Sequence, residues 1–367
     1  MIHSYPDYYK DFSCIAGECE ATCCAGWQIV VDEASLKKYK NVTGEFRERI
    51  RDGVDFKEGV FCQKEGKRCA FLNDRNLCDM YTALGEEALC ETCTRYPRHI
   101  EEFENVREHT LSISCPVAAR MILLKKEPVS FYSEEGEASD EIFDDFDPMF
   151  YEVLKESREE LLAILQDRSL DFELRAALAW NYGKLLQDKM DEGMLYAQEN
   201  RMAEVMSTEY LEKLRPELAK LKESAAWGEI SEKLFSVLFE LEVLQGAWEE
   251  EIRECNCKEN RQYEAEFMEY WNRHLPEFAQ VAEQLSVYFL STYFCGAVYD
   301  EYVASKVKLS VLSVFFVWEL LLARWIKNGK QLSVEELLST VYRYSRELEH
   351  SDENLCTMDR VLEELDI

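Results

Sequence analysis

The sequence predicts a mainly α-helical protein, in which an irregular, metal-stapled, cysteine-rich N-terminal domain with short strands precedes an α-helical bundle. Two observations lead to this fold class. Ten of the fourteen cysteines lie between Cys14 and Cys115, and from Pro148 onward apolar residues recur at spacings of three and four. With 47% hydrophobic and 31% charged residues, the 367-residue chain has the composition of a folded protein long enough for more than one core.

The cysteine-rich region predicts a first domain over residues 1–125. Its short apolar runs, GWQIVVD and LSIS, are typical of small strands, and such a loop-rich region needs bound metal as a staple. The stretch KKEPVSFYSEEGEASDEIFDDFDP mixes Pro, Gly, Ser and acidic residues, which favours an exposed acidic linker over residues 126–147. Patterns such as MFYEVLKESREELLAILQ then predict an α-helical domain over residues 148–367, with roughly six to eight helices.

The net charge of −31 is unevenly placed along the chain. Residues 1–125 carry 17 Lys and Arg against 21 Asp and Glu, which leaves −27 for residues 126–367. We therefore expect no nucleic-acid partner and no membrane partner, because phosphate groups need a basic face. The acidic second half either attracts lysine-bearing proteins or serves solubility alone.

The N-terminal stretch MIHSYPDYYKDF lacks the basic start and apolar run of a secretory signal. The longest uncharged apolar stretch, Leu309 to Trp318, is too short to span a bilayer and predicts a buried core helix. We therefore expect a cytoplasmic protein. Thiols stay reduced there, so a dense cysteine cluster indicates metal binding and not disulfides.

The spacing of the cysteines supports metal binding, because thiols a few residues apart let one loop offer two sulfurs to one ion or cluster. Adjacent cysteines point in different directions, so one of Cys23 and Cys24 is expected to bridge, to face a second site, or only to pack. Zinc and iron–sulfur clusters use the same ligands, and spacing alone does not separate them. The Cys-x3-Cys-x2-Cys arrangement usual for radical S-adenosylmethionine enzymes is absent, since Cys19-x3-Cys23 continues to Gly26.

Three blocks within residues 8–125 resemble the flagellin lysine-N-methylase family and, more broadly, zinc- or iron-chelating cysteine-cluster domains. They are DFSCIAGECEATCCAGWQIVVD, CAFLNDRNLCDMYTALGEEALCETCTRYPRHI and LSISCPVAARMILL. The resemblance implies a protein-lysine N-methyltransferase of the bacterial flagellum that transfers methyl groups from S-adenosylmethionine to flagellin. It also implies a cysteine-bound iron–sulfur cluster of the 4Fe-4S type, with zinc as the alternative. The implied metal ligands are Cys14, Cys19, Cys23, Cys24, Cys69, Cys78, Cys90, Cys93 and Cys115.

Lysine methylation needs a neutral amine, and a free lysine has a pKa of about 10.4, so the site must remove a proton. Tyrosines and carboxylates can do this, and the motif blocks offer Asp79, Tyr81 and Tyr96 as catalytic candidates. Arg98 can hold the carboxylate of the cosubstrate. The alternative is that Tyr96 and Arg98 only lock the loop behind Cys93. No G-x-G occurs, so a Rossmann-type cosubstrate site is not predicted.

Two function classes remain open. One is the lysine methyltransferase, and the other is a non-catalytic, zinc-stapled protein-binding module with an acidic helical half. Cys62 lies outside the motif blocks, and the cysteines in helical sequence are expected to pack without binding metal. These are Cys255, Cys257, Cys295 and Cys356.

Overall fold

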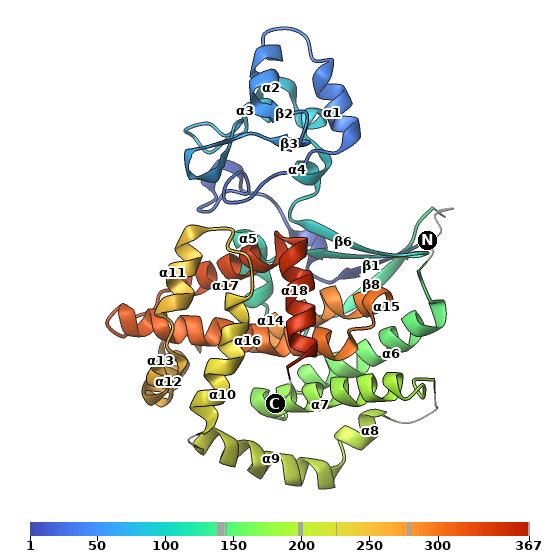
Figure 1. Ribbon diagram of the computed structural model, residues 1–367, viewed down its shortest axis with the longest axis vertical. Coiled ribbons are helices and arrows are strands. Elements are labelled where there is room, and N and C mark those ends of the chain that lie inside the picture. Colours follow the sequence, from blue (N-terminus) through green and yellow to red (C-terminus); the bar gives the residue numbers. More distant parts are fainter. Residues whose placement is uncertain (138–142, 144, 197–200, 225, 277–279, 366–367) are drawn as a thin grey trace.

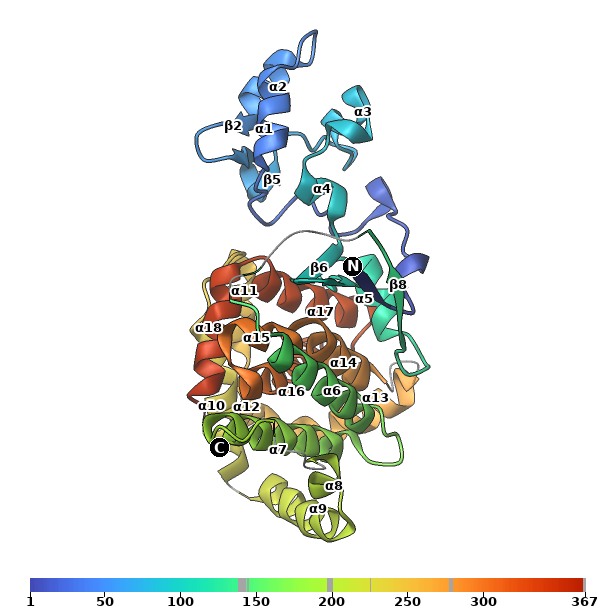
Figure 2. The same ribbon diagram turned by 90° about the vertical axis from the view of Figure 1, so that its right-hand side faces the viewer.

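The computed structural model describes the chain except for residues 138–142, 144, 197–200, 225, 277–279 and 366–367. Figures 1 and 2 show a small lobe standing at one end of a larger helical body. We call residues 14–95 the cysteine lobe, because they hold nine of the cysteines. The remaining described residues form the body.

The cysteine lobe is built from short elements around a small core of its own. Ile29, Tyr39, Phe61 and Phe71 are among its buried residues, together with Cys69 and Cys90. Its elements are α1 Glu33–Lys40, α2 Arg47–Gly53, β2 Val54–Asp55, β3 Val60–Phe61, β4 Gln63–Lys64, β5 Arg68–Cys69, α3 Asp79–Leu84 and α4 Glu91–Arg95. With so little regular structure, the lobe matches the predicted loop-rich region that needs a staple.

A four-stranded sheet lies between the lobe and the helices. Its strand order is β6-β7-β1-β8, formed by β1 Ile2–Pro6, β6 Arg98–Phe103, β7 Val106–Leu111 and β8 Phe131–Glu135. The strand β1 runs parallel to β7 and antiparallel to β8. The following helix α5, Pro116–Leu123, belongs with its buried face to the same core as the C-terminal helices.

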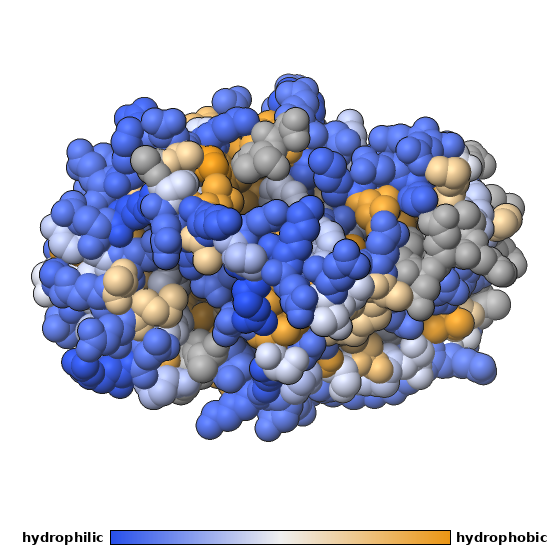
Figure 3. Space-filling view, turned by 90° about the horizontal axis from the view of Figure 1, so that it is seen from below, coloured by the Kyte–Doolittle hydropathy of each residue, from blue (hydrophilic) through white to orange (hydrophobic). Residues whose placement is uncertain are grey.

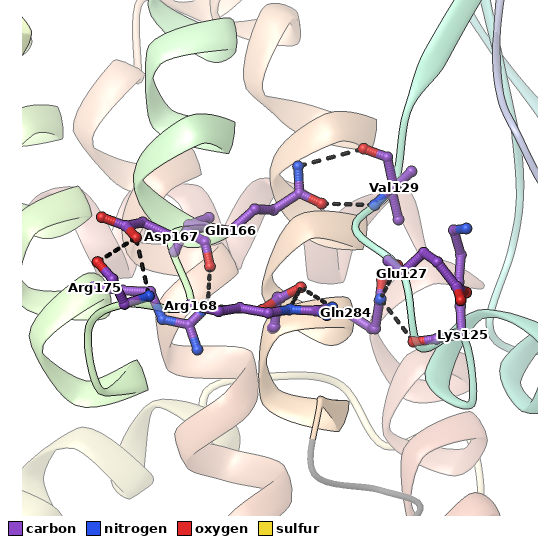
Figure 4. Close-up of polar contacts among 11 residues, drawn as sticks. Lys125, Glu127, Val129, Gln166, Asp167, Arg168, Arg175 and Gln284 are labelled. Carbon is purple, nitrogen blue, oxygen red and sulfur yellow. Dashed lines mark hydrogen bonds and ion pairs between the residues drawn. The ribbon is translucent and has the colours of Figure 1, made fainter.

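The segment after α5 is fixed to the body by side-chain amides (Figure 4). The amide of Gln166 accepts from Val129 N at 2.6 Å and donates to Val129 O at 3.3 Å. Gln284 donates to the carbonyls of Lys125 and Glu127 at 2.9 and 3.0 Å. Residues 126–135 of the predicted linker are thus bound to the body and paired in the sheet, while 138–142 and 144 lie outside the described residues.

The helices of the body pack around one long central helix, α16. It contacts α7, α14, α17 and α18. Thirteen helical segments occur among the described residues of 148–367, more than predicted, because sequence runs such as 246–274 are interrupted by turns. They are α6 Pro148–Leu165, α7 Phe172–Asp191, α8 Arg201–Val205, α9 Thr208–Glu223, α10 Ala226–Phe235, α11 Gly246–Glu254, α12 Cys257–Asn260, α13 Glu264–His274, α14 Val281–Tyr293, α15 Ala297–Asp300, α16 Val303–Lys327, α17 Val334–Glu349 and α18 Asp352–Glu363.

By length and composition, α16 is the one helix among the described residues that could cross a membrane. More than half of its most apolar window, 56%, is buried inside the protein, and a core helix passes the same test. Leu309, Leu312 and Phe316 are at most 3% exposed, which agrees with the predicted core helix.

Figure 3 shows a largely hydrophilic lower face of the body, on which apolar side chains form only small separate patches.

The predicted fold class is confirmed: the protein is mainly α, with short strands confined to the N-terminal part. The division into domains 1–125 and 148–367 remains a proposal, and the two hydrophobic cores divide the described residues differently. Tyr8, Phe103, Leu111 and Ile113 share the large core with the helices, whereas the small core lies between Ile29 and Cys90. Long-range strand pairing draws the N-terminal strand and residues 98–135 onto the body.

Candidate metal centre and active site

All fourteen cysteines lie in the described part of the chain, and all are free thiols. The nine predicted metal ligands occur in the lobe and at its junction with the body. We describe them in two groups, which Cys23 links, because it acts electrostatically on Cys24 and Cys93 as well as on Cys14 and Cys115. We call Cys14, Cys19, Cys23 and Cys115 the junction thiols, and Cys24, Cys69, Cys78, Cys90 and Cys93 the lobe thiols.

The junction thiols join the two parts of the molecule. Burial raises the pKa of Cys115, and the nearby Cys19 and Cys14 raise it further. Cys115 is the N-cap residue of α5, so it is held by the body, whereas the other three lie on one loop of the lobe. Metal bound by all four would therefore tie the lobe to the body.

The lobe thiols come from four separate stretches of the lobe. Burial raises the pKa of Cys69 to about 12, with Cys24, Cys78 and Cys90 adding to it. Cys78 and Cys90 are the N-cap residues of α3 and α4. Backbone N–H groups of the first turn partly offset the raised pKa of Cys78, as they do for Cys115 at the start of α5. Helix N-termini therefore favour thiolates in both groups.

The neighbours Cys23 and Cys24 link the two groups, and whether one of them bridges, faces a second site or only packs stays a prediction. The Cys23 thiol donates a hydrogen bond to Cys24 and lowers the pKa of Cys24 to about 7. The same bond, together with burial, raises the pKa of Cys23. An analogous bond from Cys93 lowers the pKa of Cys90. One thiol of each pair is thereby prepared to bind metal as a thiolate.

The nine thiols can bind a metal as thiolates, either as zinc or as an iron–sulfur cluster. Four sulfurs about 2.3 Å from a single zinc lie about 3.8 Å apart. Among the described residues, no three of the nine thiols lie within 4.8 Å of one another. The nine thiols are therefore not gathered around one ion in this structure, although Cys23 lies against Cys24 and Cys90 against Cys93.

Beside the junction thiols lies a polar group that we call the Ser114 cluster: Tyr96, Ser112, Ser114 and His350. The hydroxyl of Ser114 is 3.0 Å from Tyr96 OH, 2.6 Å from Ser112 Oγ and 3.0 Å from His350 Nε2. The His350 ring packs against Trp27, whose indole donates to Cys23 O at 2.8 Å. Burial lowers the pKa of His350 to about 3, with Arg346 adding to the effect, so the imidazole is neutral.

Glu349, next to His350 at the end of α17, forms a second polar group with two tyrosines. It accepts from Tyr288 OH at 2.5 Å and from Tyr293 OH at 2.7 Å. Burial raises the pKa of Glu349, although these hydrogen bonds oppose the shift. His99 packs on Tyr293 and pairs with Glu101 at 2.6 Å, and its side chain is 39% exposed. A partly exposed imidazole thus lies against one of the two tyrosines that bind the buried carboxyl group.

The predicted catalytic residues are not brought together. Tyr96 lies in the Ser114 cluster. Asp79 is bound by Arg49 at 3.3 Å and by Asn73 at 2.9 Å, and Tyr81 is 51% exposed on α3. Arg98 is exposed, with its guanidinium over the rings of Tyr9 and Phe12. Their catalytic and binding roles remain predictions.

Sequence reasoning missed the residues that the helical body contributes to this region. Arg346, Glu349 and His350 lie in α17 or directly after it, and Tyr288 and Tyr293 lie in α14. None belongs to a recognisable motif. Only Ser114 could have been found, since it occupies the SCP block beside Cys115.

The fold and the site define a thiol-rich protein whose nine candidate ligands lie in a small lobe and at its junction with a helical body. A family model described as the FliB lysine N-methylase C-terminal domain matches residues 158–367. The chain belongs to the FliB lysine N-methylase family. This confirms the predicted resemblance, and the match falls in the helical half, where the sequence showed no motif.

Three relatives are similar over a shorter stretch. The "Flagellar biosynthetic protein FliU" of Salmonella muenchen is 29% identical over 133 residues, which cover 32% of this chain and 75% of the relative. A "Lysine-N-methylase" of Salmonella typhimurium is also 29% identical over 133 residues, and one of Salmonella choleraesuis is 28% identical over 131. The chain spans 31% of the length of each of these two. No solved structure matches it.

Replacing a junction thiol and replacing a lobe thiol should each remove only the metal that is bound by that group. We expect Cys19→Ala to lower the metal bound by the junction thiols and Cys78→Ala that bound by the lobe thiols, because each loses a coordination bond. Metal content per chain, measured on anaerobically purified protein, should fall in part in each variant and further in the double variant. Cys62→Ala, a half-buried thiol of the lobe outside both groups, is the matched control. Complete loss of metal in either single variant would show that the nine thiols form one centre.

Replacing His350 should change how stability depends on pH. The folded pKa of about 3 lies below the unfolded value of 6.5, so the unfolded state takes up a proton first as the pH falls. The wild type should therefore lose about 1.4 kcal/mol between pH 7.5 and 5.5 through this residue, and His350→Gln should not. Urea unfolding at both pH values measures the difference. The exposed His274→Gln is the control, and a gap between wild type and His350→Gln that stays constant with pH would contradict the account.

Proposed function

We propose that this protein transfers methyl groups from S-adenosylmethionine to lysine side chains of flagellin. The observation that carries the proposal is the position of α17. This helix lies within the region matched by the family model, and its end meets the junction thiols through Arg346 and His350. The part of the chain that marks it as a lysine methylase and the part that can hold metal thus meet at one place.

The junction thiols and the lobe thiols are the proposed ligands of an iron–sulfur cluster, with zinc as the alternative at either group. The excess of thiols over the four that one zinc needs supports the cluster. When bound, such a cluster would supply one-electron chemistry beside the reacting groups. The chain's own contribution is to place polar residues of the body next to Cys115 and Cys23.

Glu349 is the proposed acceptor of the proton that the substrate lysine must lose. Burial raises the pKa of Glu349, and a buried carboxyl group with a raised pKa is suited to act as a base. His99 and Tyr293 connect it to the surface. Once neutral, the amine attacks the methyl carbon through its lone pair. The new C–N bond forms as the C–S bond breaks, and the sulfur leaves as a neutral thioether.

The proposed place for the cosubstrate is a cleft along α5 with a volume of about 630 Å³, within the usual range for small-molecule sites. Asp7, Asp11, Arg120 and Lys125 line it, so acidic and basic groups face each other as the amino-acid end of S-adenosylmethionine requires. Asp7 Oδ1 is buried and has no hydrogen-bond partner. Arg120 lies five residues beyond Cys115, about 7 Å along the helix axis.

The acidic charge of the body supports a lysine-bearing protein substrate. Residues 126–367 carry a net −27, and opposite charge speeds the encounter of two proteins. We place the reaction in the cytoplasm, where the free thiols would stay reduced.

The decisive assay combines the anaerobically purified protein, S-adenosylmethionine and flagellin from the same organism, and reads lysine masses for added CH2 groups. We expect methylation by the wild type and a loss of at least about tenfold in rate for Glu349→Gln, within the range for removing a general base. Arg120→Gln should mainly raise the KM for the cosubstrate. Glu353→Gln, an exposed glutamate on α18, is the matched control.

Two outcomes would contradict the proposal. If the metal-loaded protein neither methylates flagellin nor binds S-adenosylmethionine, the protein-binding module is the better account. If methylation occurs at the same rate in Glu349→Gln, the enzyme assignment stands and the proposed base is wrong.

A further inference from the structure

A third group of metal-binding side chains lies in the helical body, apart from the thiols of the lobe and the junction. The ligand atoms of Cys255, Cys257 and Glu319 all lie within 4.8 Å of one another. Among the described residues, no other three His, Cys, Asp or Glu side chains meet this condition. The sequence predicts only packing for both cysteines, because Glu319 lies more than sixty positions further along the chain.

The backbone holds these three side chains from three different helices. Cys255 is the C-cap residue of α11, and Cys257 is the first residue of α12. The single residue between them, Asn256, caps α12 by accepting from Glu259 N at 3.0 Å. Glu319 lies on α16, against which both α11 and α12 pack. Two sulfurs on a tight turn thus face a carboxylate on the central helix.

The spacing suits one ion. A tetrahedral zinc with Zn–S of about 2.3 Å and Zn–O of about 2.1 Å places its ligand atoms roughly 3.5–3.8 Å apart. The observed limit of 4.8 Å is close enough for small side-chain rotations to complete the site. These residues therefore meet the distance condition for a single ion, which the nine N-terminal thiols do not.

The charges in this group lack a positive partner. Glu319 Oε2 is buried without a hydrogen-bond partner, and none of the ion pairs between described residues includes Glu319. A buried carboxylate is costly unless it is paired or bound to metal. A divalent cation would supply the missing charge.

Burial also defines which side of the group is open. Cys257 is 4% exposed, whereas Cys255 is only half-buried. The Cys255 side is therefore the more exposed one, from which a fourth ligand can approach.

We propose that Cys255, Cys257 and Glu319 bind one zinc-type divalent cation, with three protein ligands and a fourth position open to water or a small ligand. Two thiolates and a carboxylate are a ligand set that zinc accepts. The bound ion would join the turn between α11 and α12 to α16. This site is independent of the proposed methyl transfer.

The test counts metal by difference in the full-length protein, because the N-terminal thiols also bind metal. Wild type, Cys257→Ser, Glu319→Gln and the control Cys356→Ser, an exposed thiol on α18, are produced with added zinc and purified anaerobically. Elemental analysis gives zinc and iron per chain. We expect wild type and Cys356→Ser to contain one more zinc per chain than the other two, with equal iron in all four proteins.

Circular dichroism and thermal unfolding of the four proteins show whether each variant is folded. Should Cys257→Ser fail to fold, Glu319→Gln decides, since it keeps the size of the side chain and removes only its charge. Equal zinc in wild type and folded Glu319→Gln would overturn the proposal. So would a Cys255–Cys257 disulfide in the anaerobic protein, detected as a mass lower by two hydrogen atoms.

Discussion

The guanidinium of Arg346 holds the two parts of this protein together at the junction thiols. Its Nε donates to Ser114 O at 2.9 Å, and its Nη2 donates to Ala21 O at 2.8 Å. Ala21 lies between Cys19 and Cys23, and Ser114 precedes Cys115. Arg346 is only 6% exposed. One buried cation on α17 thus fixes both stretches of chain that supply the junction thiols, and each charged hydrogen bond of this kind contributes about 1.5–3 kcal/mol.

Because the core of the lobe is small, its fold is stabilised by contacts with the body. The lobe has few regular elements, and at the junction it is held by Arg346, by the contact of Trp27 with His350, and by Lys67, which donates to Leu244 O. Bound metal would add a covalent tie through Cys115. The negative potential of several thiolates is offset by Arg346 and by the helix N-termini at Cys78, Cys90 and Cys115.

The sequence predicted the cysteine-rich region and the helical remainder well, because local patterns carry both. Thiol spacing indicated metal binding, the family resemblance implied the nine candidate ligands, and apolar spacing of three and four identified the long helices. Burial of Leu309 and Phe316 follows from the same pattern.

What the sequence did not predict depends on contacts between distant residues. The strand β1 pairs with β7 about a hundred residues later, which moves the N-terminus onto the body. Glu349 and His350 look like ordinary residues at the end of a helix, and only tertiary packing places them beside Tyr293 and Ser114. Glu319 gains a possible metal-binding role only when α16 meets Cys255 and Cys257. The structure therefore identified the residues around the candidate site, whereas the candidate ligands were already predicted from the sequence.

The central claim is that the helical body fixes the metal centre of the junction thiols through Arg346. The most direct measurement compares metal content and the absorption spectrum of anaerobic wild type, Arg346→Met and Arg343→Met. Arg343 lies on the same helix but pairs with Glu251 at 2.9 Å, so it is the matched control. We predict that Arg346→Met, still helical by circular dichroism, loses part of its metal and changes its spectrum, while Arg343→Met matches the wild type. A folded Arg346→Met with the metal and spectrum of the wild type would contradict the account.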